Sequence, residues 1–184
     1  MFKFSPITNE KVANILAPLL SLLHEKLGIH PNIITGSSFI IGLISVPFIL
    51  TKHLGVGLIF ILVSLLLDGL DGPIARKYGY NLDFGEKLDT ILDRFLETAI
   101  FLSFAITGYA HFKIVILSLM SIFLMTLLRN KTKFDPGFKR AVLFLGYLTN
   151  FHFAFQIIFF VNLFGFIVNL LILDFENQEL INPT

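Results

Sequence analysis

Four aspartates gathered between long apolar runs are the feature that most constrains this chain. Asp68, Asp71, Asp89 and Asp93 fall within one stretch of 26 residues. Residues three or four apart share a face of a helix, so this spacing pairs Asp68 with Asp71 and Asp89 with Asp93. A carboxylate at the centre of a membrane helix costs roughly 2.5–3.5 kcal/mol. We therefore expect two helices whose acidic faces oppose each other, with cations between them.

A divalent metal centre explains this concentration of negative charge. Two divalent cations would cancel four carboxylate charges, and hard oxygen ligands suit Mg²⁺, Mn²⁺ or Ca²⁺ rather than Zn²⁺. Bound Mg²⁺ commonly shares its ligand shell with substrate phosphates, so two such ions indicate phosphoryl-group chemistry. Any one of these aspartates taken alone is better explained as a helix N-cap or a solvated loop end. The four together favour the metal centre.

The composition is that of a membrane protein. Of the 184 residues, 55% are hydrophobic and 15% are charged, and the mean hydropathy is +0.80, whereas soluble domains average about 45–50% apolar residues. We expect a single all-α integral membrane domain over residues 1–184. The net charge of +1 gives no indication of a nucleic-acid partner. Because the chain has no cysteine, disulfides, a thiol nucleophile and a cysteine-based zinc site are excluded.

The apolar segments predict about six transmembrane helices between residues 33 and 173. The segments cover 33–50, 56–71, 85–107, 113–128 and a long stretch, 141–173, that divides at a turn near Thr149–Asn150. Gly72 and Pro73 are expected to end the second segment, with a polar connection up to residue 84. Residues 174–184 are expected to form a polar tail. An amphipathic helix over 8–27 either lies in the membrane interface or packs on the domain as an ordinary first helix.

The distribution of basic residues predicts an orientation. Six segments place both termini on one side of the membrane. Of the 14 Lys and Arg residues, all but Lys52, Lys113 and Arg94 fall on that side. Since cytoplasmic loops carry the excess of positive charge, both termini and the acidic site are expected at the cytoplasmic face.

The acidic residues belong to a longer pattern that resembles a known signature. The chain reads Asp68-x-x-Asp71-Gly72-x-x-Ala75-Arg76, then eight residues, then Gly85-x-x-x-Asp89-x-x-x-Asp93. Every position and both spacings resemble the signature of the CDP-alcohol phosphotransferases. The resemblance implies a homodimer that transfers a phosphatidyl-type group from a CDP-linked lipid, CDP-diacylglycerol or CDP-archaeol, to an alcohol and releases CMP.

The resemblance also implies roles for individual residues. The four aspartates would hold two Mg²⁺ or Mn²⁺ ions, and Asp93 stands at the position of the catalytic base. Gly72, Ala75, Arg76 and Gly85 would serve the CDP-linked donor. Small residues permit a close approach of the ligand to the backbone or of one helix to another, and the guanidinium fork of Arg76 matches a phosphate. Taken alone, each glycine is explained by a turn or by helix packing.

A basic loop from Arg129 to Arg140 is the second candidate site. Its cations are Arg129, Lys131, Lys133, Lys139 and Arg140. They suit a pocket for an anionic acceptor such as inositol phosphate or glycerol phosphate. The alternative is that cationic loops merely remain on the cytoplasmic side.

The remaining polar residues carry weaker expectations. Glu97 follows Asp93 by one helical turn and is expected to pair with Arg94 rather than to extend the metal shell. The five histidines have no paired spacing, and we interpret them as interface or packing residues.

Two other functions fit part of the pattern. A Mg²⁺-dependent polyprenyl transferase also binds diphosphate through aspartates, but it usually needs more spanning helices and lacks this Ala-Arg and glycine spacing. A cation transporter would use intramembrane carboxylates. The chain, however, shows no repeated halves with matching broken helices.

Overall fold

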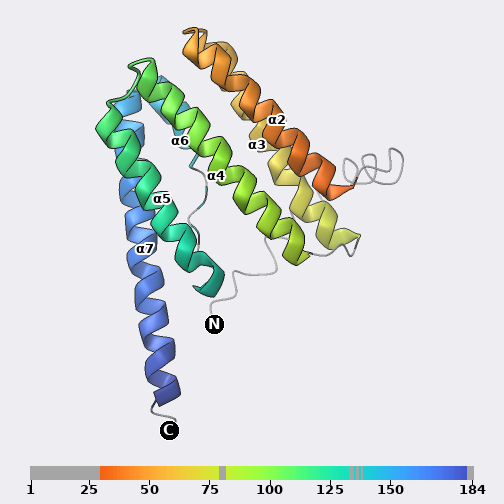
Figure 1. Ribbon diagram of the computed structural model, residues 1–184, viewed down its shortest axis with the longest axis vertical. Helices are drawn as coiled ribbons and strands as arrows, with labels where there is room; N and C mark the ends of the chain where they lie inside the picture. The colour runs from red at the N-terminus through yellow and green to blue at the C-terminus, as the bar shows by residue number, and fades with distance from the viewer. Residues whose placement is uncertain (1–29, 79–81, 133–134, 136, 138, 182–184) are drawn as a thin grey trace.

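The protein is built from α-helices throughout the part that the structure describes. The computed structural model describes residues 30–78, 82–132, 135, 137 and 139–181 (Figure 1). The helices are α2 (Pro31–Leu50), α3 (Leu54–Lys77), α4 (Leu82–Ile106), α5 (Phe112–Thr132), α6 (Val142–Leu148) and α7 (Phe151–Ile181). The all-α prediction is therefore confirmed for these residues. The amphipathic helix predicted at 8–27 lies outside them.

Local sequence signals set the ends of α2. The Nδ1 atom of His30 accepts a hydrogen bond from the Asn32 backbone N–H at 3.2 Å, and Pro31 occupies the first turn, where no N–H is needed. At the other end Thr51 closes the helix. Lys52 adopts φ 64°, which turns the chain sharply into α3.

Helix α3 continues beyond the point where the sequence predicts its end. It passes through Gly72 and Pro73 and reaches Lys77, so the expected break at Gly72–Pro73 is wrong. A proline removes one helical hydrogen bond and crowds the carbonyl four residues earlier, but it does not prevent the next turn from forming. Here the Ile74 side chain is completely buried beside Leu70 and Ile34. This tertiary packing stabilises the last turns of α3.

The C-terminal third also differs from the prediction. The turn at Thr149–Asn150 is where the sequence places it, but α6 has only seven residues. A helix of that length rises about 10 Å, which is too short to cross a bilayer alone. Helix α7 runs on to Ile181, beyond the predicted start of the polar tail at Asp174. Residues 174–181 include Glu, Gln and Leu, which favour helix, and the next proline is Pro183.

The helices alternate in direction and form two packed groups. Helix α2 lies against α3 and α4, whereas α7 lies against α5 and α6 (Figure 1). Helices α4 and α5 join the groups. The α2–α3 and α4–α5 connections lie at one end of the bundle, and the end of α3 and the start of α4 lie at the other.

Aromatic side chains fill the seam between α4 and α7. The rings of Phe101 and Phe155 meet edge to face, with centroids 4.9 Å apart. The ring centroids of Phe104 and Phe151 are 4.8 Å apart. Tyr109, in the α4–α5 connection, packs its ring against Phe151. Aromatic pairs of this kind stabilise a core beyond the contribution of buried area. The cluster gives part of the sequence's 22 phenylalanines a structural role.

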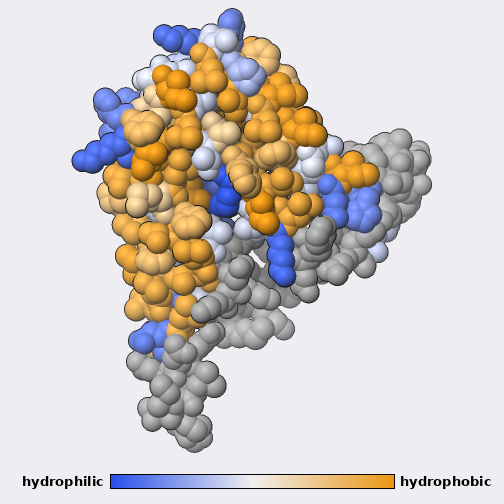
Figure 2. Space-filling model, viewed as in Figure 1, coloured by the Kyte–Doolittle hydropathy of each residue, from blue (hydrophilic) through white to orange (hydrophobic). Residues whose placement is uncertain are grey.

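The outside of the bundle is strongly apolar. Figure 2 shows hydrophobic residues over most of the visible face of the helices. Exposed apolar residues occur on every long helix, including Ile40 on α2, Leu66 on α3, Phe123 on α5 and Phe164 on α7. Two helices, over Asn32–Leu50 and Phe151–Phe175, are long and apolar enough to cross a membrane. A soluble protein rarely exposes so large an apolar surface.

Gly42 allows α2 to pack on two helices at once. A Cβ atom at this position would lie 2.5 Å from Cδ2 of Leu96 on α4 and 2.9 Å from Oγ of Ser64 on α3. Both distances are shorter than side chains tolerate. A residue without a side chain at position 42 therefore sets the spacing of α2, α3 and α4.

We expect Gly42→Ala to destabilise the protein by about 1–3 kcal/mol, because the added methyl group displaces Leu96 and Ser64. Gly36→Ala is the matched control on the same helix, since its Cβ meets nothing within 4 Å; it should be neutral or stabilising by up to about 1 kcal/mol. Thermal unfolding in detergent measures both. Equal melting temperatures for the two variants would contradict this assignment.

Candidate functional site

Three of the four aspartates converge on one point between α3 and α4. One carboxylate oxygen from each of Asp68, Asp89 and Asp93 lies within 4.8 Å of the others. Asp68 comes from α3, and the other two are one turn apart on α4. Each side chain is half-buried. The predicted opposition of acidic faces is thus present for these three residues, although α3 and α4 make few direct contacts.

Arg140 reaches this cluster from the loop between α5 and α6. Its Nη2 atom donates to Oδ2 of Asp68 at 3.0 Å and to Oδ1 of Asp93 at 2.7 Å. Its Nη1 atom donates to Oγ of Ser64 at 3.2 Å. The guanidinium group is buried, with 4% of the side chain exposed. Arg140 therefore links α3 to α4 through charge-assisted hydrogen bonds.

Helix α2 supplies polar residues that the sequence did not identify as part of the site. Thr35 and Ser38 are buried and line a small cavity together with the three carboxylates. Ser38 also donates to the Ser64 carbonyl at 2.9 Å, so it supports the residue that accepts from Arg140. A signal was available in the sequence. Asn32, Thr35 and Ser38 recur at every third position of an otherwise apolar segment, which places them on one face of the helix.

The remaining predicted site residues are described only in part. The structure describes only the backbone of Asp71, Gly72, Ala75, Arg76, Arg129 and Lys131, and Lys133 lies outside the described residues. Gly85 is described. A Cβ atom there would meet only Oδ1 of Asn32, at an ordinary contact distance of 3.9 Å. Close packing of α4 against α2 therefore does not require a glycine at position 85.

Comparison with known proteins identifies the family. The family model described as CDP-alcohol phosphatidyltransferase matches residues 28–174. The chain belongs to the CDP-alcohol phosphatidyltransferase family. All four signature aspartates and the whole described bundle up to Asp174 lie within the match.

Several curated relatives in this family share about a third of their aligned residues with the chain. An archaetidylinositol phosphate synthase from Pyrococcus horikoshii is 34% identical over 102 residues, which cover 55% of this chain and 54% of that protein. A CDP-diacylglycerol–glycerol-3-phosphate 3-phosphatidyltransferase from Mycoplasma genitalium is 33% identical over 94 residues, covering 51% and 36%. A CDP-diacylglycerol–serine O-phosphatidyltransferase from Helicobacter pylori is 32% identical over 69 residues, covering 38% and 29%. The chain thus aligns with about half or less of each relative.

The converging carboxylates fit the metal dependence that is general in this family. Three oxygen ligands within 4.8 Å of one another are the hard donors that Mg²⁺ and Mn²⁺ prefer. Arg140 brings one positive charge to these three negative ones. The donor set is therefore compatible with a divalent cation.

A second charged group lies beside the carboxylates, deeper in the bundle. Nη1 of Arg94 lies 2.8 Å from Oε2 of Glu97, which confirms the pair expected from the sequence. Nζ of Lys139 lies 3.3 Å from both carboxylate oxygens of Asp135. Burial lowers the pKa of the Lys139 ammonium group, and the nearby carboxylates of Glu97 and Asp135 offset this only in part. Of the loop cations predicted to bind the acceptor, Lys139 and Arg140 are thus both buried in ion pairs.

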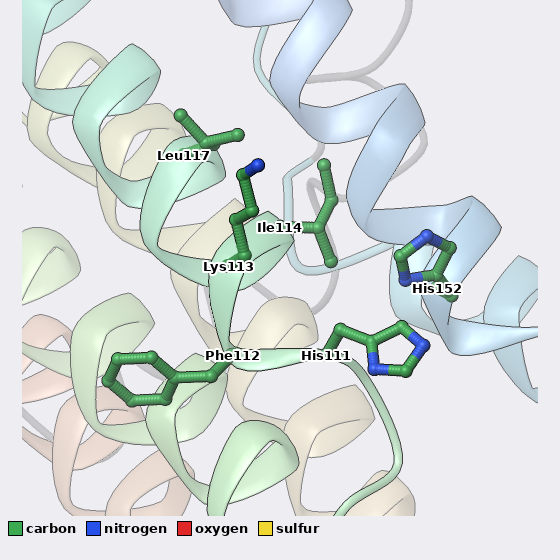
Figure 3. Close-up of a pocket in the computed structure, with 6 residues that line it drawn as sticks. All are labelled: His111, Phe112, Lys113, Ile114, Leu117 and His152. Carbon is green, nitrogen blue, oxygen red and sulfur yellow. The ribbon is translucent and has the colours of Figure 1, made fainter.

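Two histidines meet at the opposite end of the bundle. Figure 3 shows His111, just before α5, and His152, at the start of α7, lining one pocket with Phe112 and Leu117. The rings pack edge to face with centroids 4.8 Å apart. No sequence spacing indicates this contact, because 41 residues separate the two positions. Among the described residues, the group of three metal-ligating side chains is the aspartate cluster, and it does not include these histidines.

Proposed function

We propose that the protein synthesises phospholipid by transferring a phosphatidyl-type group from a CDP-linked lipid to an alcohol, with release of CMP. One observation carries the proposal. Three signature aspartates from two helices meet within 4.8 Å in a chain that the family model matches from residue 28 to residue 174. The names of the relatives describe reactions of this class.

The proposed reaction makes two demands on the site. The donor diphosphate carries negative charge that must be neutralised, and the acceptor hydroxyl is a weak nucleophile until a base takes its proton. The hydroxyl oxygen bonds to the phosphorus that carries the lipid. The bond from that phosphorus to the bridging oxygen breaks, and CMP leaves with the electron pair. The hydroxyl proton passes to the base.

Asp68, Asp71, Asp89 and Asp93 are the proposed ligands for two Mg²⁺ or Mn²⁺ ions. Bound ions of this kind neutralise diphosphate charge and stabilise a leaving phosphate. Gly72, Ala75, Arg76 and Gly85 are proposed to bind the donor. The room beside Gly85 supports this role, because helix packing alone does not require a glycine there.

Asp93 is the proposed general base. Arg140 donates to its Oδ1 atom, which holds the carboxylate in one orientation and engages one of its two oxygens. The other oxygen is then the proton acceptor for the alcohol. This arrangement supports a division of labour in which Asp68 mainly binds metal and Asp93 also moves the proton.

The acceptor is proposed to be an alcohol that carries a phosphate group. The loop from Arg129 to Arg140 supports this class by its charge, and two relatives have names that contain glycerol-3-phosphate or archaetidylinositol phosphate. We propose that Arg129, Lys131, Lys133 and Arg140 attract this phosphate. Lys139 belongs to the same loop, but its ammonium group is buried against Asp135.

The protein is proposed to cross the membrane several times, with the aspartate cluster at the cytoplasmic face. Five helices are longer than 19 residues, and the short α6 is proposed to belong to a sixth crossing. An even number of crossings puts the start of α2 and the end of α7 on one side, as the bundle allows (Figure 1). The excess of Lys and Arg supports the cytoplasmic orientation. The family resemblance also supports a homodimer.

Release of CMP tests the proposed function. Purified protein in detergent should release CMP from CDP-diacylglycerol or CDP-archaeol only when an acceptor and Mg²⁺ are present. Exhaustive chelation with EDTA should abolish turnover, and Mg²⁺ or Mn²⁺ should restore it, since the carboxylates alone repel the diphosphate. A panel of acceptors should include inositol phosphate, glycerol 3-phosphate and serine. Full turnover after chelation would refute the metal assignment, and absence of CMP with every acceptor would refute the reaction.

Asp68 and Asp93 should fail in different ways when each is changed to Asn. Asp68→Asn removes an anionic ligand, so the affinity for Mg²⁺ and for the donor should both fall. Asp93→Asn removes the proton acceptor and should lower kcat by roughly 10²–10⁴-fold while the donor still binds. Calorimetric titration of a CDP-lipid analogue with Mg²⁺ distinguishes the two effects. If Asp93→Asn loses donor affinity as completely as Asp68→Asn does, Asp93 is chiefly a metal ligand.

The loop cations should govern acceptor affinity rather than donor affinity. Replacing Lys131 and Lys133 together with Gln removes two positive charges outside the signature, and it should raise the acceptor KM about tenfold with little change in the donor KM. Lys52→Gln, at the α2–α3 connection, is the control with the same change of residue. An unchanged acceptor KM would mean that these lysines serve only membrane topology.

A further inference from the structure

Two adjacent cations enter the bundle side by side at the end of the α5–α6 loop. Lys139 and Arg140 each leave about 4% of their surface exposed. Arg140 donates to Asp93 on α4. Lys139 interacts electrostatically with Glu97, which lies on the same face of α4 one turn further along. Two neighbouring cations of the loop thus interact with two acidic residues one helical turn apart on α4, Arg140 with Asp93 and Lys139 with Glu97.

Glu97 needs this second cation. Its side chain is 4% exposed, and Oε2 lies 2.8 Å from Nη1 of Arg94. The two atoms are close enough for ionic attraction and both are buried, but neither makes a hydrogen bond within the part of the chain that the structure describes. A buried carboxylate with one poorly aligned partner is strongly destabilised. The positive charge of Lys139 adds to that of Arg94 in stabilising this carboxylate.

Asp135 fixes Lys139 from the loop side. Its carboxylate pairs with the ammonium group at 3.3 Å and also accepts a hydrogen bond from the Gly137 backbone N–H at 2.9 Å. Gly137 has φ 66°, a backbone conformation that glycine adopts without strain. The loop turn and the lysine are therefore held by one side chain. On the other side of Lys139, the Arg140 carbonyl accepts a hydrogen bond from the Leu143 backbone N–H at 3.2 Å, at the start of α6.

We propose that Lys139 is a positioning residue, whose ammonium group, paired with Asp135 and attracted by Glu97, sets Arg140 against Asp68 and Asp93. The inference rests on the proposed function, because it assigns Lys139 a task at the same site. The inference gives Lys139 a different role from that of the loop cations proposed to bind the acceptor phosphate. The partners of the two cations distinguish them, because Lys139 pairs with Asp135 of the loop itself, whereas Arg140 donates to two signature aspartates that would face substrate.

Removal of one partner and removal of both should have opposite consequences. Lys139→Met leaves Glu97 buried without its second cation and releases Arg140, so the acceptor KM should rise about tenfold and the melting temperature should fall by about 5 °C or more. The double variant Glu97→Gln/Lys139→Met removes the buried carboxylate of Glu97 together with the cation near it, and it leaves Arg94 and Asp135, two charges of opposite sign. Both the melting temperature and the acceptor KM should therefore return part of the way to the values of the parent protein.

This cycle distinguishes positioning from direct contact. If Lys139 binds the acceptor, Glu97→Gln cannot restore the acceptor KM, and that result overturns the proposal. If Lys139→Met alone changes neither KM nor stability, the proposal also fails. If Lys139→Met does not fold, the double variant is the test, and it should fold and keep an acceptor KM within about threefold of the parent value.

A second cycle tests whether the effect passes through Arg140. In an Arg140→Gln background, Lys139→Met should change the acceptor KM by less than about twofold, because the residue that it positions is already absent. A full additional increase would overturn the proposal. Thermal unfolding of the parent protein and the three variants in the Glu97 cycle does not depend on turnover. It therefore reports the coupling of Lys139 to Glu97 even if no CMP is released and the proposed reaction is wrong.

Discussion

Compensation of buried charge is the constraint on which this structure depends. Asp68 and Asp93 stand on helices that barely touch each other, inside a bundle whose outer surface is apolar. Carboxylates in such surroundings are tolerated only with cationic partners. Arg140 provides one by donating both Nη2 hydrogens, one to each carboxylate. The Arg140 side chain thereby joins α3 to α4, and the acidic cluster becomes a fixed arrangement rather than two separate acidic surfaces.

Helix α2 makes that arrangement possible. Gly42 allows it to approach α3 and α4 together, and Ser38 bonds to the Ser64 carbonyl from the same face. Ser64 in turn accepts from Arg140. A chain of hydrogen bonds thus connects α2, which carries no carboxylate, to the guanidinium group of Arg140 at the centre of the site. Small residues at helix interfaces serve two purposes here, because they permit close packing and supply hydroxyl groups for buried hydrogen bonds.

The sequence predicted what depends on local spacing and missed what depends on distant contacts. Asp89 and Asp93 share a face because of helical periodicity, and the pairing of Arg94 with Glu97 follows from the same geometry. The continuation of α3 past Pro73 depends on burial of Ile74 against α2, which no local signal reports. Arg140 meets Asp68 across 72 residues and Asp93 across 47. The metal-binding role of Asp71 and the donor-binding role of Gly72, Ala75, Arg76 and Gly85 stay predictions.

Adjacent positions in a charged loop need not share a function. Lys139 and Arg140 are neighbours, and a count of charges treats them as equivalent. Their partners differ, however: the lysine pairs with a carboxylate of the loop itself and is attracted by Glu97, whereas the arginine pairs with two signature aspartates. A lysine presents a compact charge, and an arginine presents a fork that bridges two acceptors. The chemistry of each side chain therefore suits the place it occupies, with the compact charge in the deeper ion pair and the bridging group at the carboxylates that would face substrate.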